Sequence, residues 1–378
     1  MVVWIQNPFD NLPGEGYRRQ RYWMMADAFV RFGHHVVYWT SDFSHATKRT
    51  RREVAGDSGA DGIEVRLIPT IPYRKNISLR RVSSHCAYAR KWLELASTPV
   101  QQPSLIITSC PTLSAADSAL ELGRRFGAKV VVDVQDAWPE TFERLAPRGF
   151  GWLAKAILYP LNRQARRIYR EANLVSGVCD RYRELTGRAD FYRAYLGIEL
   201  ESGVSAADGA SNRRIRMVYS GNMGRTYDLD TVVEAVAANE DFELDIAGFG
   251  GELSCPPSAR DRVRFHGMLP AADLRRLFAE CDVGVIPMSD ASWVGIPNKM
   301  FDYSAAGLSV VSSLGGETAA LLERYGCGAI YRAGDRDALS SAVRIAADLP
   351  RSASRRLCEA EFDAVKIYNE YVKWVCHD

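Results

Sequence analysis

Short apolar runs alternate along the chain with longer stretches whose apolar residues recur with helical spacing. Such runs have the length of buried strands, and the longer stretches have the pattern of amphipathic helices. Regular alternation of this kind indicates parallel sheets assembled from βαβ units. In the first half, the pattern predicts strands at 2–6, 35–39, 62–67, 105–108, 129–134 and 174–177, and helices at 18–32, 79–96, 114–126 and 152–172.

A second series follows, with strands predicted at 216–219, 242–247, 263–266, 283–287, 309–312 and 328–331, and helices at 228–238, 271–279, 298–306, 317–325 and 336–347. The stretch between the two series is rich in Gly, Ser, Ala and Asp, which is typical of a linker. We therefore expect two doubly wound, Rossmann-like α/β domains facing an interdomain cleft, because open parallel sheets bind ligands at their carboxyl ends. The expected parts are domains at 1–197 and 214–354, a linker at 198–213, and a C-terminal helix at 355–378, predicted over 355–376, crossing back to the first domain.

The composition is that of a globular protein, with 47% hydrophobic and 25% charged residues in 378. No apolar run is long enough to span a bilayer, and the N-terminus lacks the basic segment of a signal peptide. The eight cysteines stand singly, without a CxxC pair, so neither a metal cage nor a disulfide framework is expected. These features predict a cytoplasmic protein with reduced cysteines.

Charge is distributed unevenly along the chain. The first 200 residues hold 29 Lys/Arg and 20 Asp/Glu, whereas the remainder holds 19 and 26. A basic half suits an anionic partner such as phosphate, nucleic acid or anionic lipid, although two domains of opposite sign could also simply attract each other. Nucleic acid is not an expected partner, because no basic motif interleaved with aromatic residues occurs.

Two stretches of the first half end strands and carry candidate ligand contacts. Gly14 and Gly16 follow the first strand and open a helix with Arg18, Arg19 and Arg21, an arrangement that can approach an anion but can also be an ordinary turn with a basic face. The second stretch follows the strand 129–134.

Two carboxylates, Asp133 and Asp136, leave the strand 129–134 at its carboxyl end, beside Gln135 and Trp138. Paired acids at such a place can bind sugar hydroxyls or act as an acid/base. The alternative is that Asp136 only caps the following turn.

In the second half, the strand at 216–219 runs into a turn containing Gly221, Asn222, Gly224 and Arg225. Glycine backbone can wrap a pyrophosphate and an arginine can neutralise it. The acids of Asp228-Leu229-Asp230 resemble a metal-binding DxD, but they fit better in the first turn of a helix, where they favour its dipole. No metal site is therefore predicted.

A helix predicted to be capped by Asn298 places the cation Lys299 in its first turn, where the helix dipole disfavours it unless an anion binds there. Asp302 lies on the same helical face and could grip ribose hydroxyls; the alternative is a surface Lys–Asp pair. Gly315, Gly316 and Glu317 begin a later helix and could cradle a ligand or form an ordinary loop.

The apolar segment 148–161 is too short to span a membrane and leads into Arg163, Arg166, Arg167 and Arg170. Trp and Tyr beside a basic helix suit the headgroup region of an anionic membrane. The alternative is that Trp152, Ile157 and Leu158 form a buried helix face and the arginines are solvated.

These motifs together resemble the retaining glycosyltransferases of family 4, especially bacterial enzymes of O-antigen (lipopolysaccharide), capsule and exopolysaccharide synthesis. The resemblance covers nearly the whole chain and rests on SCPT, VDVQDAWPE, YSGNMGR, HGMLP with DLRRLFAECDVGVIPM, and GIPNKMFDYSAAG with LGGE. It implies the GT-B fold, a nucleoside-diphosphate sugar as donor substrate with no further cofactor, no metal, and retention of the donor's anomeric configuration.

The resemblance also implies roles for single residues. Gly14 and Gly16 look like the donor-facing loop, and Asp136 looks like the polar residue facing donor and acceptor. Asn222 and Arg225 look like the pyrophosphate turn. Asn298 and Lys299 resemble the phosphate-binding helix start. Asp302 resembles the acid that ends the family's E-x7-E motif.

The sequence departs from the family pattern at several points. The first acid of the E-x7-E motif would fall at Val294. The Lys that often follows the pyrophosphate Arg, and a His near the strand-end acid, are not evident.

The implied reaction releases a nucleoside diphosphate whose charge Arg225, Lys299 and helix N–H groups stabilise. A glycan or polyprenyl-linked acceptor at the inner face of the cell membrane is implied. A nucleotide-sugar epimerase of the same fold and a non-catalytic nucleotide-sugar-binding subunit are the alternatives.

Overall fold

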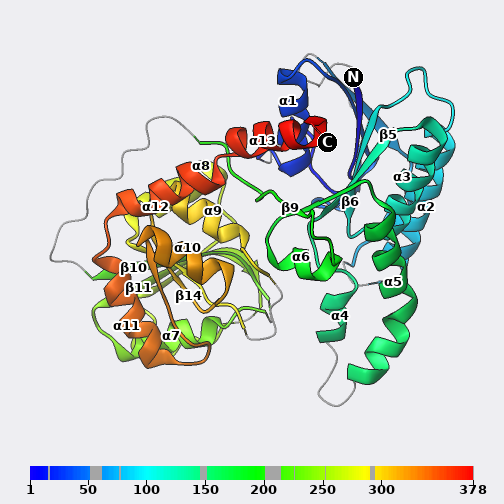
Figure 1. The fold of residues 1–378 in the computed structure, drawn as a ribbon. Helices are drawn as coiled ribbons and strands as arrows, with labels where there is room; N and C mark the ends of the chain where they lie inside the picture. The colour runs from blue at the N-terminus through cyan, green and yellow to red at the C-terminus, as the bar shows by residue number, and fades with distance from the viewer. Residues whose placement is uncertain are drawn as a thin grey trace. The chain divides into compact units, whose positions relative to one another are not determined.

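The chain forms two α/β units, each built on one parallel sheet (Figure 1). Unit 1 contains Met1–Leu196 and Ala364–Asp378, and unit 2 contains Gly197–Asp363. The computed structural model describes residues 1–15, 18–51, 62–75, 78–144, 151–200, 214–224, 226–251, 253–289 and 294–377.

The sheet of unit 1 has seven strands in the order β5-β2-β1-β6-β7-β8-β9. They are β1 (Val2–Gln6), β2 (His35–Ser41), β5 (Ile63–Ile68), β6 (Leu105–Cys110), β7 (Lys129–Val134), β8 (Leu174–Gly177) and β9 (Tyr192–Arg193), and a small antiparallel pair is formed by β3 (Phe43–Ser44) and β4 (Arg49–Thr50). The helices are α1 (Arg21–Arg31), α2 (Leu79–Ala96), α3 (Leu113–Phe126), α4 (Glu140–Arg144), α5 (Gly151–Glu171), α6 (Arg181–Thr186) and α13 (Ala364–His377).

The core of unit 1 joins the two ends of the chain. Trp23 and Phe29 of α1 are buried in the same hydrophobic cluster as Tyr368 and Tyr371 of α13. Trp374 of α13 also stacks on Tyr192, with the ring centroids 4.4 Å apart. Burial of these large rings stabilises the docking of the C-terminal helix on unit 1.

Arg21 and Asp133 form a fully buried ion pair inside unit 1. The Arg21 Nε and one terminal nitrogen each donate to an Asp133 carboxylate oxygen at 2.8 Å, and Tyr22 and Ser176 donate to the same carboxylate. Burial alone would raise the pKa of Asp133, but Arg21 and these hydrogen bonds outweigh it and lower the pKa. Arg21 is therefore not available to add charge to the Gly14 loop, and that prediction is wrong. The prediction that Asp133 acts beside Asp136 is also wrong.

The sheet of unit 2 has six strands in the order β12-β11-β10-β13-β14-β15. They are β10 (Ile215–Met223), β11 (Phe242–Gly250), β12 (Val263–Gly267), β13 (Val283–Ile286), β14 (Ser309–Ser312) and β15 (Gly328–Ile330). The helices are α7 (Leu229–Ala238), α8 (Ala271–Glu280), α9 (Asn298–Ala305), α10 (Glu317–Tyr325), α11 (Arg336–Ala347) and α12 (Arg351–Leu357), with a 3-10 turn at Pro257–Ala259.

The single tail helix predicted over 355–376 is instead interrupted. Helix α12 continues into a π-helical turn at Cys358–Phe362, and Asp363 then takes an extended conformation before α13 begins. The Phe362 carbonyl accepts a hydrogen bond from the Ile198 N–H at 2.8 Å, and Ile198 forms a parallel bridge with Asp363. This pairing with a second chain segment ends the helical hydrogen bonding at residue 363.

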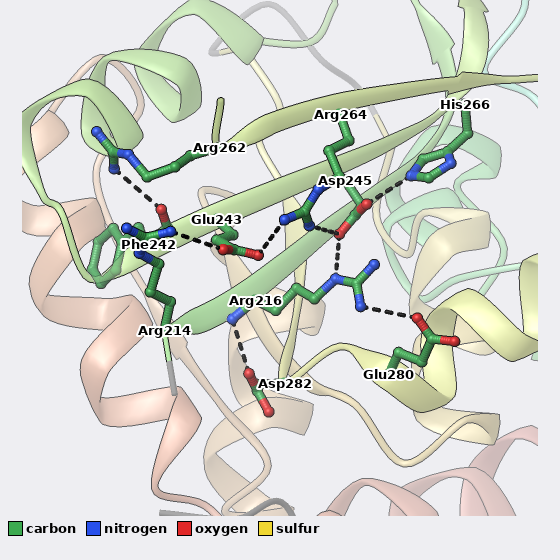
Figure 2. Close-up of polar contacts among 10 residues, drawn as sticks. All are labelled: Arg214, Arg216, Phe242, Glu243, Asp245, Arg262, Arg264, His266, Glu280 and Asp282. Carbon is green, nitrogen blue, oxygen red and sulfur yellow. Dashed lines mark hydrogen bonds and ion pairs between the residues drawn. The ribbon is translucent and has the colours of Figure 1, made fainter. Parts of the chain in front are cut away.

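A charged cluster on β10, β11 and β12 belongs to the framework of unit 2 (Figure 2). Asp245 is fully buried and accepts from Arg216 Nε at 2.5 Å, while His266 Nε2 lies 2.6 Å from its other oxygen. Burial would raise the pKa of Asp245, but these hydrogen bonds and the charges of Arg216 and Arg264 lower it. A buried carboxylate with this many partners fixes the three strands against one another.

Candidate active site

The carboxyl ends of β10 and β11 are built from glycines that let two backbones approach closely. A Cβ on Gly248 would lie 1.8 Å from the Gly221 carbonyl oxygen, and a Cβ on Gly250 would lie 2.6 Å from Asn222 Oδ1. Gly221 and Gly250 also have positive φ angles of 120° and 116°. Asn222 is exposed, and Gly221 and Gly224 are partly exposed beside it. The strand ends therefore present open backbone, as contact with a ligand would require.

Lys299 lies in the first turn of α9 and is only 6% exposed. Its Nζ lies 3.9 Å from the ring centroid of Tyr227 and 4.6 Å from that of Tyr219. A Cβ on Gly221 would lie 3.1 Å from the same nitrogen. Burial lowers the pKa of Lys299 to about 8, and the charge of Asp302 opposes this. The structure thus brings together Gly221 and Lys299, and it excludes the alternative of a surface Lys–Asp pair.

The start of α9 differs from the prediction in one respect. Pro297, in an extended conformation, is the N-cap, and Asn298 is the first helical residue and makes no side-chain cap. Asn298 is exposed, whereas Lys299 and Met300 after it are buried, and the Met300 N–H donates to the Pro297 carbonyl at 2.9 Å. Asp302 lies one turn further on and is half-buried.

The beginnings of α9 and α10 are tied together. Thr318 Oγ1, in the first turn of α10, donates to the Gly295 carbonyl at 2.7 Å. Gly316 is the N-cap of α10 with φ 62°, and Gly315 and Gly316 are exposed while Glu317 is half-buried in the first turn. The two helix starts therefore lie at the same edge of the sheet.

The turn after β10 is also anchored at this edge. The Asp228 N–H donates to the Pro287 carbonyl at 2.7 Å, and Ser289 N–H donates to Thr226. Asp228 is the N-cap of α7, accepting from Thr231, and Asp230 lies in the first helical turn. The prediction that these acids serve the start of the helix is confirmed. Arg225, predicted as the pyrophosphate-binding charge, lies outside the described residues.

In unit 1, Asp136 follows β7 and is exposed. The Trp138 N–H donates to its backbone carbonyl at 2.8 Å, and within the described ranges its carboxylate accepts no hydrogen bond, so the turn is not capped by the side chain. Reduced solvation by the surrounding protein raises the pKa of Asp136, and the charge of Arg81 opposes this. Asp136 thus offers an accessible carboxylate in an environment that favours its protonated form.

Gly14 lies in an exposed loop after β1, with φ 86° and open space around its Cβ position. Its neighbour Glu15 is held by Arg51, whose Nε lies 2.7 Å from the Glu15 carboxylate. The positive φ, rather than close packing, explains the glycine. Gly16 lies outside the described residues.

Side chains that the sequence analysis did not name gather around Trp138, two residues after Asp136. Arg81 and His85 of α2 lie beside Trp138, with His45, Lys48 and Tyr73 from the segments that follow β3 and β5. His85 therefore lies beside Trp138, with the ring centroids 6.2 Å apart, and only the position of α2 reveals this histidine because it is distant in sequence.

Helix α5 has an exposed apolar face. Trp152 is 71% exposed and Ile157 is 67% exposed, whereas only Ala165, Ile168 and Tyr169 of the helix are buried. Within the described part of unit 1, Trp152 and Ile157 are therefore not buried, and Leu158 is only partly buried. An open pocket on this helix is lined by Lys155, Tyr159, Pro160, Asn162, Arg163, Gln164, Arg166, Arg167 and Arg170.

Two negative findings concern the described part of the chain. No helix in it combines the length and apolar character required to cross a bilayer. No group of three or more His, Cys, Asp or Glu side chains in it is arranged to hold a metal ion.

Two family models match the chain. One, described as a glycosyl transferase 4-like domain, matches residues 19–195, and the other, described as glycosyl transferases group 1, matches residues 214–348. Together they extend over most of both units. No curated protein sequence matches the chain.

Solved structures share the fold over the full length. Sucrose-phosphate synthase from Thermosynechococcus elongatus has a TM-score of 0.75 at 15% identity, covering 100% of this chain and 98% of that one. Anabaena HepE in complex with UDP-glucose has a TM-score of 0.65 at 15% identity, with 100% of both chains covered. The lipopolysaccharide outer core galactosyltransferase WaaB in its apo form has a TM-score of 0.64 at 13% identity, with 99% of both covered. The chain has the GT-B fold and belongs to the family 4-type glycosyltransferases.

Proposed function

We propose that the chain is a retaining glycosyltransferase that takes a sugar from a nucleoside-diphosphate sugar without a metal ion. The observation that carries the proposal is Lys299, a buried cation at a helix start beside the open backbone of Gly221. The helix dipole and the loss of solvation both disfavour a charge there, and a bound diphosphate would remove both penalties. Anabaena HepE, a structure with the same fold, is in complex with UDP-glucose, which supports a donor of this class.

Different residues of unit 2 contact different parts of the donor. Lys299, Arg225 and the strand-end backbone at Gly221, Asn222 and Gly224 neutralise the diphosphate as it leaves. The N–H groups at the starts of α9 and α10 stabilise the same charge. They belong to the segments of Asn298 and of Gly315, Gly316 and Glu317. Asp302 accepts hydrogen bonds from the ribose hydroxyls.

Unit 1 supplies the acceptor side. Asp136 orients the acceptor hydroxyl or takes its proton, and the glycines at 14 and 16 approach the donor. The acceptor attacks on the face that the leaving group vacates, so no side chain is assigned as a nucleophile. The protein itself provides the positive charge that stabilises the leaving group, and the nucleotide-sugar is a substrate, with no further cofactor.

The test is a thermal-unfolding screen of the whole chain against a panel of UDP-, GDP- and ADP-sugars. We expect one nucleotide class to raise the melting temperature of the wild type. Lys299→Met should weaken binding by about 10- to 100-fold, the loss of one charge-assisted hydrogen bond. Arg276→Met removes an exposed charge of unit 2, whose side chain is 79% exposed, and should leave binding unchanged. Equal affinity in all three proteins contradicts the assignment.

Turnover separates the enzyme classes. A transferase releases nucleoside diphosphate in the presence of acceptor. Conversion of the donor sugar without acceptor would identify an epimerase instead, and binding without any turnover across an acceptor panel would identify a non-catalytic subunit.

We further propose that the acceptor is a glycan or a polyprenyl-linked glycan of bacterial surface polysaccharide synthesis, used at an anionic membrane surface on the inner face of the cell membrane. Helix α5 supports this, because exposed Trp152 and Ile157 lie on the same helix as the exposed Arg163, Arg166 and Arg170. Aromatic and apolar side chains enter the headgroup region while arginines meet anionic lipid.

Vesicle flotation tests the membrane surface. We expect binding to vesicles with anionic lipid but not to neutral vesicles, and weakening of this binding by salt. Reversing Arg163, Arg166 and Arg170 to Glu should weaken it at least about a hundredfold, at about 1 kcal/mol for each basic residue lost. Arg276→Glu serves as the control. Equal recovery in the soluble fraction with both lipids contradicts the proposal.

A further inference from the structure

The loop after β1 carries Gly14 in a turn that its own backbone closes. The Glu15 N–H donates to the Leu12 carbonyl at 3.1 Å, and Gly14 between them has φ 86°. Pro13 precedes Gly14, and Pro followed by a Gly with positive φ is typical of the two central positions of a type II turn. Gly14 is exposed at the tip, with open space around its Cβ position. The turn therefore presents bare backbone.

Arg51 holds this turn with a side chain that is only 3% exposed. Its Nε donates to one Glu15 carboxylate oxygen at 2.7 Å, and one terminal nitrogen donates to the other oxygen at 3.2 Å. The same terminal nitrogen donates to the carbonyl of Asp10, which precedes the turn, at 2.7 Å. The Glu15 carboxylate also accepts from the Leu12 N–H at 2.9 Å. Arg51 thus fixes the turn at both of its ends.

The second terminal nitrogen of Arg51 connects the turn to the sheet. It donates to the Ser41 carbonyl at 2.7 Å and to Thr40 Oγ1 at 3.3 Å, at the carboxyl end of β2. Strand β2 pairs with β1, which leads into the turn. All five N–H groups of the guanidinium therefore have acceptors within unit 1.

These contacts immobilise exposed backbone and not a part of the core. A buried guanidinium is costly in free energy unless its donors are satisfied, and here the satisfied charge holds a loop whose tip, Gly14, is exposed. Loops held in this way on a rigid scaffold are typical of ligand contacts. A binding group has to stay within about 0.5 Å of its productive position, and the contacts of Arg51 supply that restraint.

We infer that Arg51 is a positioning residue for the proposed transfer reaction, and that it fixes the turn 12–15 so that Gly14 meets the donor in its reactive position. The inference rests on the proposed function, in which Gly14 approaches the donor. Because its N–H groups are all used within the protein, Arg51 acts through the turn and not by contact with the donor. A displacement of about 1 Å in such a contact can slow a reaction by about 100-fold.

Arg51→Met tests the inference in the whole chain. The amides of Leu12 and Glu15 should exchange hydrogen faster, because the contacts that hold the closed turn are lost. Release of nucleoside diphosphate from UDP-, GDP- and ADP-glucose is measured with water and with the acceptor panel, and binding of UDP, GDP and ADP is measured by calorimetry. We expect kcat to fall about 10- to 100-fold. The affinity for the nucleoside diphosphate should stay that of the wild type, because unit 2 holds the diphosphate in the proposed function.

Arg66→Met is the matched control. The Arg66 Nε also lies 2.7 Å from a carboxylate oxygen, that of Glu64, but on β5 the two side chains are 31% and 43% exposed. Loss of this pair should leave both turnover and hydrogen exchange in the turn unchanged.

Two conservative variants show whether Arg51 acts through Glu15. Arg51→Lys keeps a charge but loses the five-donor fork, so it should restore kcat only in part. Glu15→Gln should lower kcat less than Arg51→Met does, and adding it to Arg51→Met should have no further effect, because both changes break the same contact. If Arg51→Met does not fold, Arg51→Lys must show the same separation of kcat from affinity.

The outcomes separate the inference from the proposed function. If the turn exchanges as in the wild type, if kcat is unchanged, or if kcat and diphosphate affinity fall together, the inference is wrong while the proposed function stands. If the wild type itself shows no turnover, the proposed function fails and the role of Arg51 in the reaction fails with it.

Discussion

Replacing Lys299 with methionine should make the free protein more stable near neutral pH while it weakens donor binding about 10- to 100-fold. The change removes a buried charge and leaves a side chain of similar length between Tyr219 and Tyr227. The pKa of Lys299 falls from the ordinary 10.5 to about 8. At about 1.4 kcal/mol per pKa unit, the buried ammonium destabilises the folded chain by about 3 kcal/mol. Loss of the contacts with the two rings destabilises the variant by about 1–2 kcal/mol. We therefore expect its free energy of unfolding to exceed that of the wild type by roughly 1–2 kcal/mol.

The gain should depend on pH in a defined direction. Below about pH 8 Lys299 is protonated in both the folded and the unfolded chain, so the wild type bears the full cost of the buried charge. Between about pH 8 and 10.5 the folded chain releases the proton that the unfolded chain retains, and the wild type becomes more stable. The advantage of Lys299→Met should therefore shrink as pH rises through this window.

Thermal unfolding of the whole chain from pH 6.5 to 9.5 measures the effect. At pH 7 we expect the unfolding transition of Lys299→Met to lie roughly 2–8 °C above that of the wild type. Arg276→Met controls for the loss of one positive charge and should show no such pH dependence. A Lys299→Met protein that is less stable than the wild type at every pH would refute the reasoning, because the ammonium would then be satisfied where it lies.

Three further predictions concern other residues and conditions. Asp136→Asn should fold normally and lower turnover at least about a hundredfold, measured as release of nucleoside diphosphate, since an acid/base or orienting carboxylate is lost; near-normal turnover would leave Asp136 without a role in the reaction. Asp133→Asn should destabilise unit 1 by about 3–5 kcal/mol in urea unfolding, because Arg21 is left buried without its partner; an unchanged midpoint would contradict this. Turnover should survive saturating EDTA, and activity restored only by manganese or magnesium would overturn the proposal of a metal-independent reaction.

The fold followed closely from the sequence because both sheets are parallel and buried. Strands covered on both faces appear as continuous apolar runs, and β6, β7 and β14 lie where such runs were predicted. Short elements gave weaker signals: α4 and α6, each with five or six residues, and β9, with two, have too few positions to show a period. The π-helical turn that breaks the tail depends on a hydrogen bond to Ile198, a tertiary contact that no local pattern contains.

The candidate residues of unit 2 could be found because helix starts and glycine turns are local features. Gly221 and Lys299 are far apart in sequence, but each stands at the end of a strand or the beginning of a helix, and parallel topology brings such points to one edge. The error at Asn298 has a local cause, since Pro297 can cap in an extended conformation and leaves asparagine as the first helical residue.

In unit 1, the roles of several charged residues depend on contacts with residues that are distant in sequence. Asp133 and Asp136 are three residues apart, and strand alternation sends them into different environments: Asp133 is fully buried and paired with Arg21, whereas Asp136 emerges beyond the strand. Arg21 and Arg81 each lie in the first turn of a helix, and the sequence does not indicate which one is a core residue. Their partners decide it, a buried carboxylate for Arg21 and the faces of Phe9 and Trp138 for Arg81. Contacts that only the folded chain creates therefore decide the role of each arginine, and no local pattern contains either set of contacts.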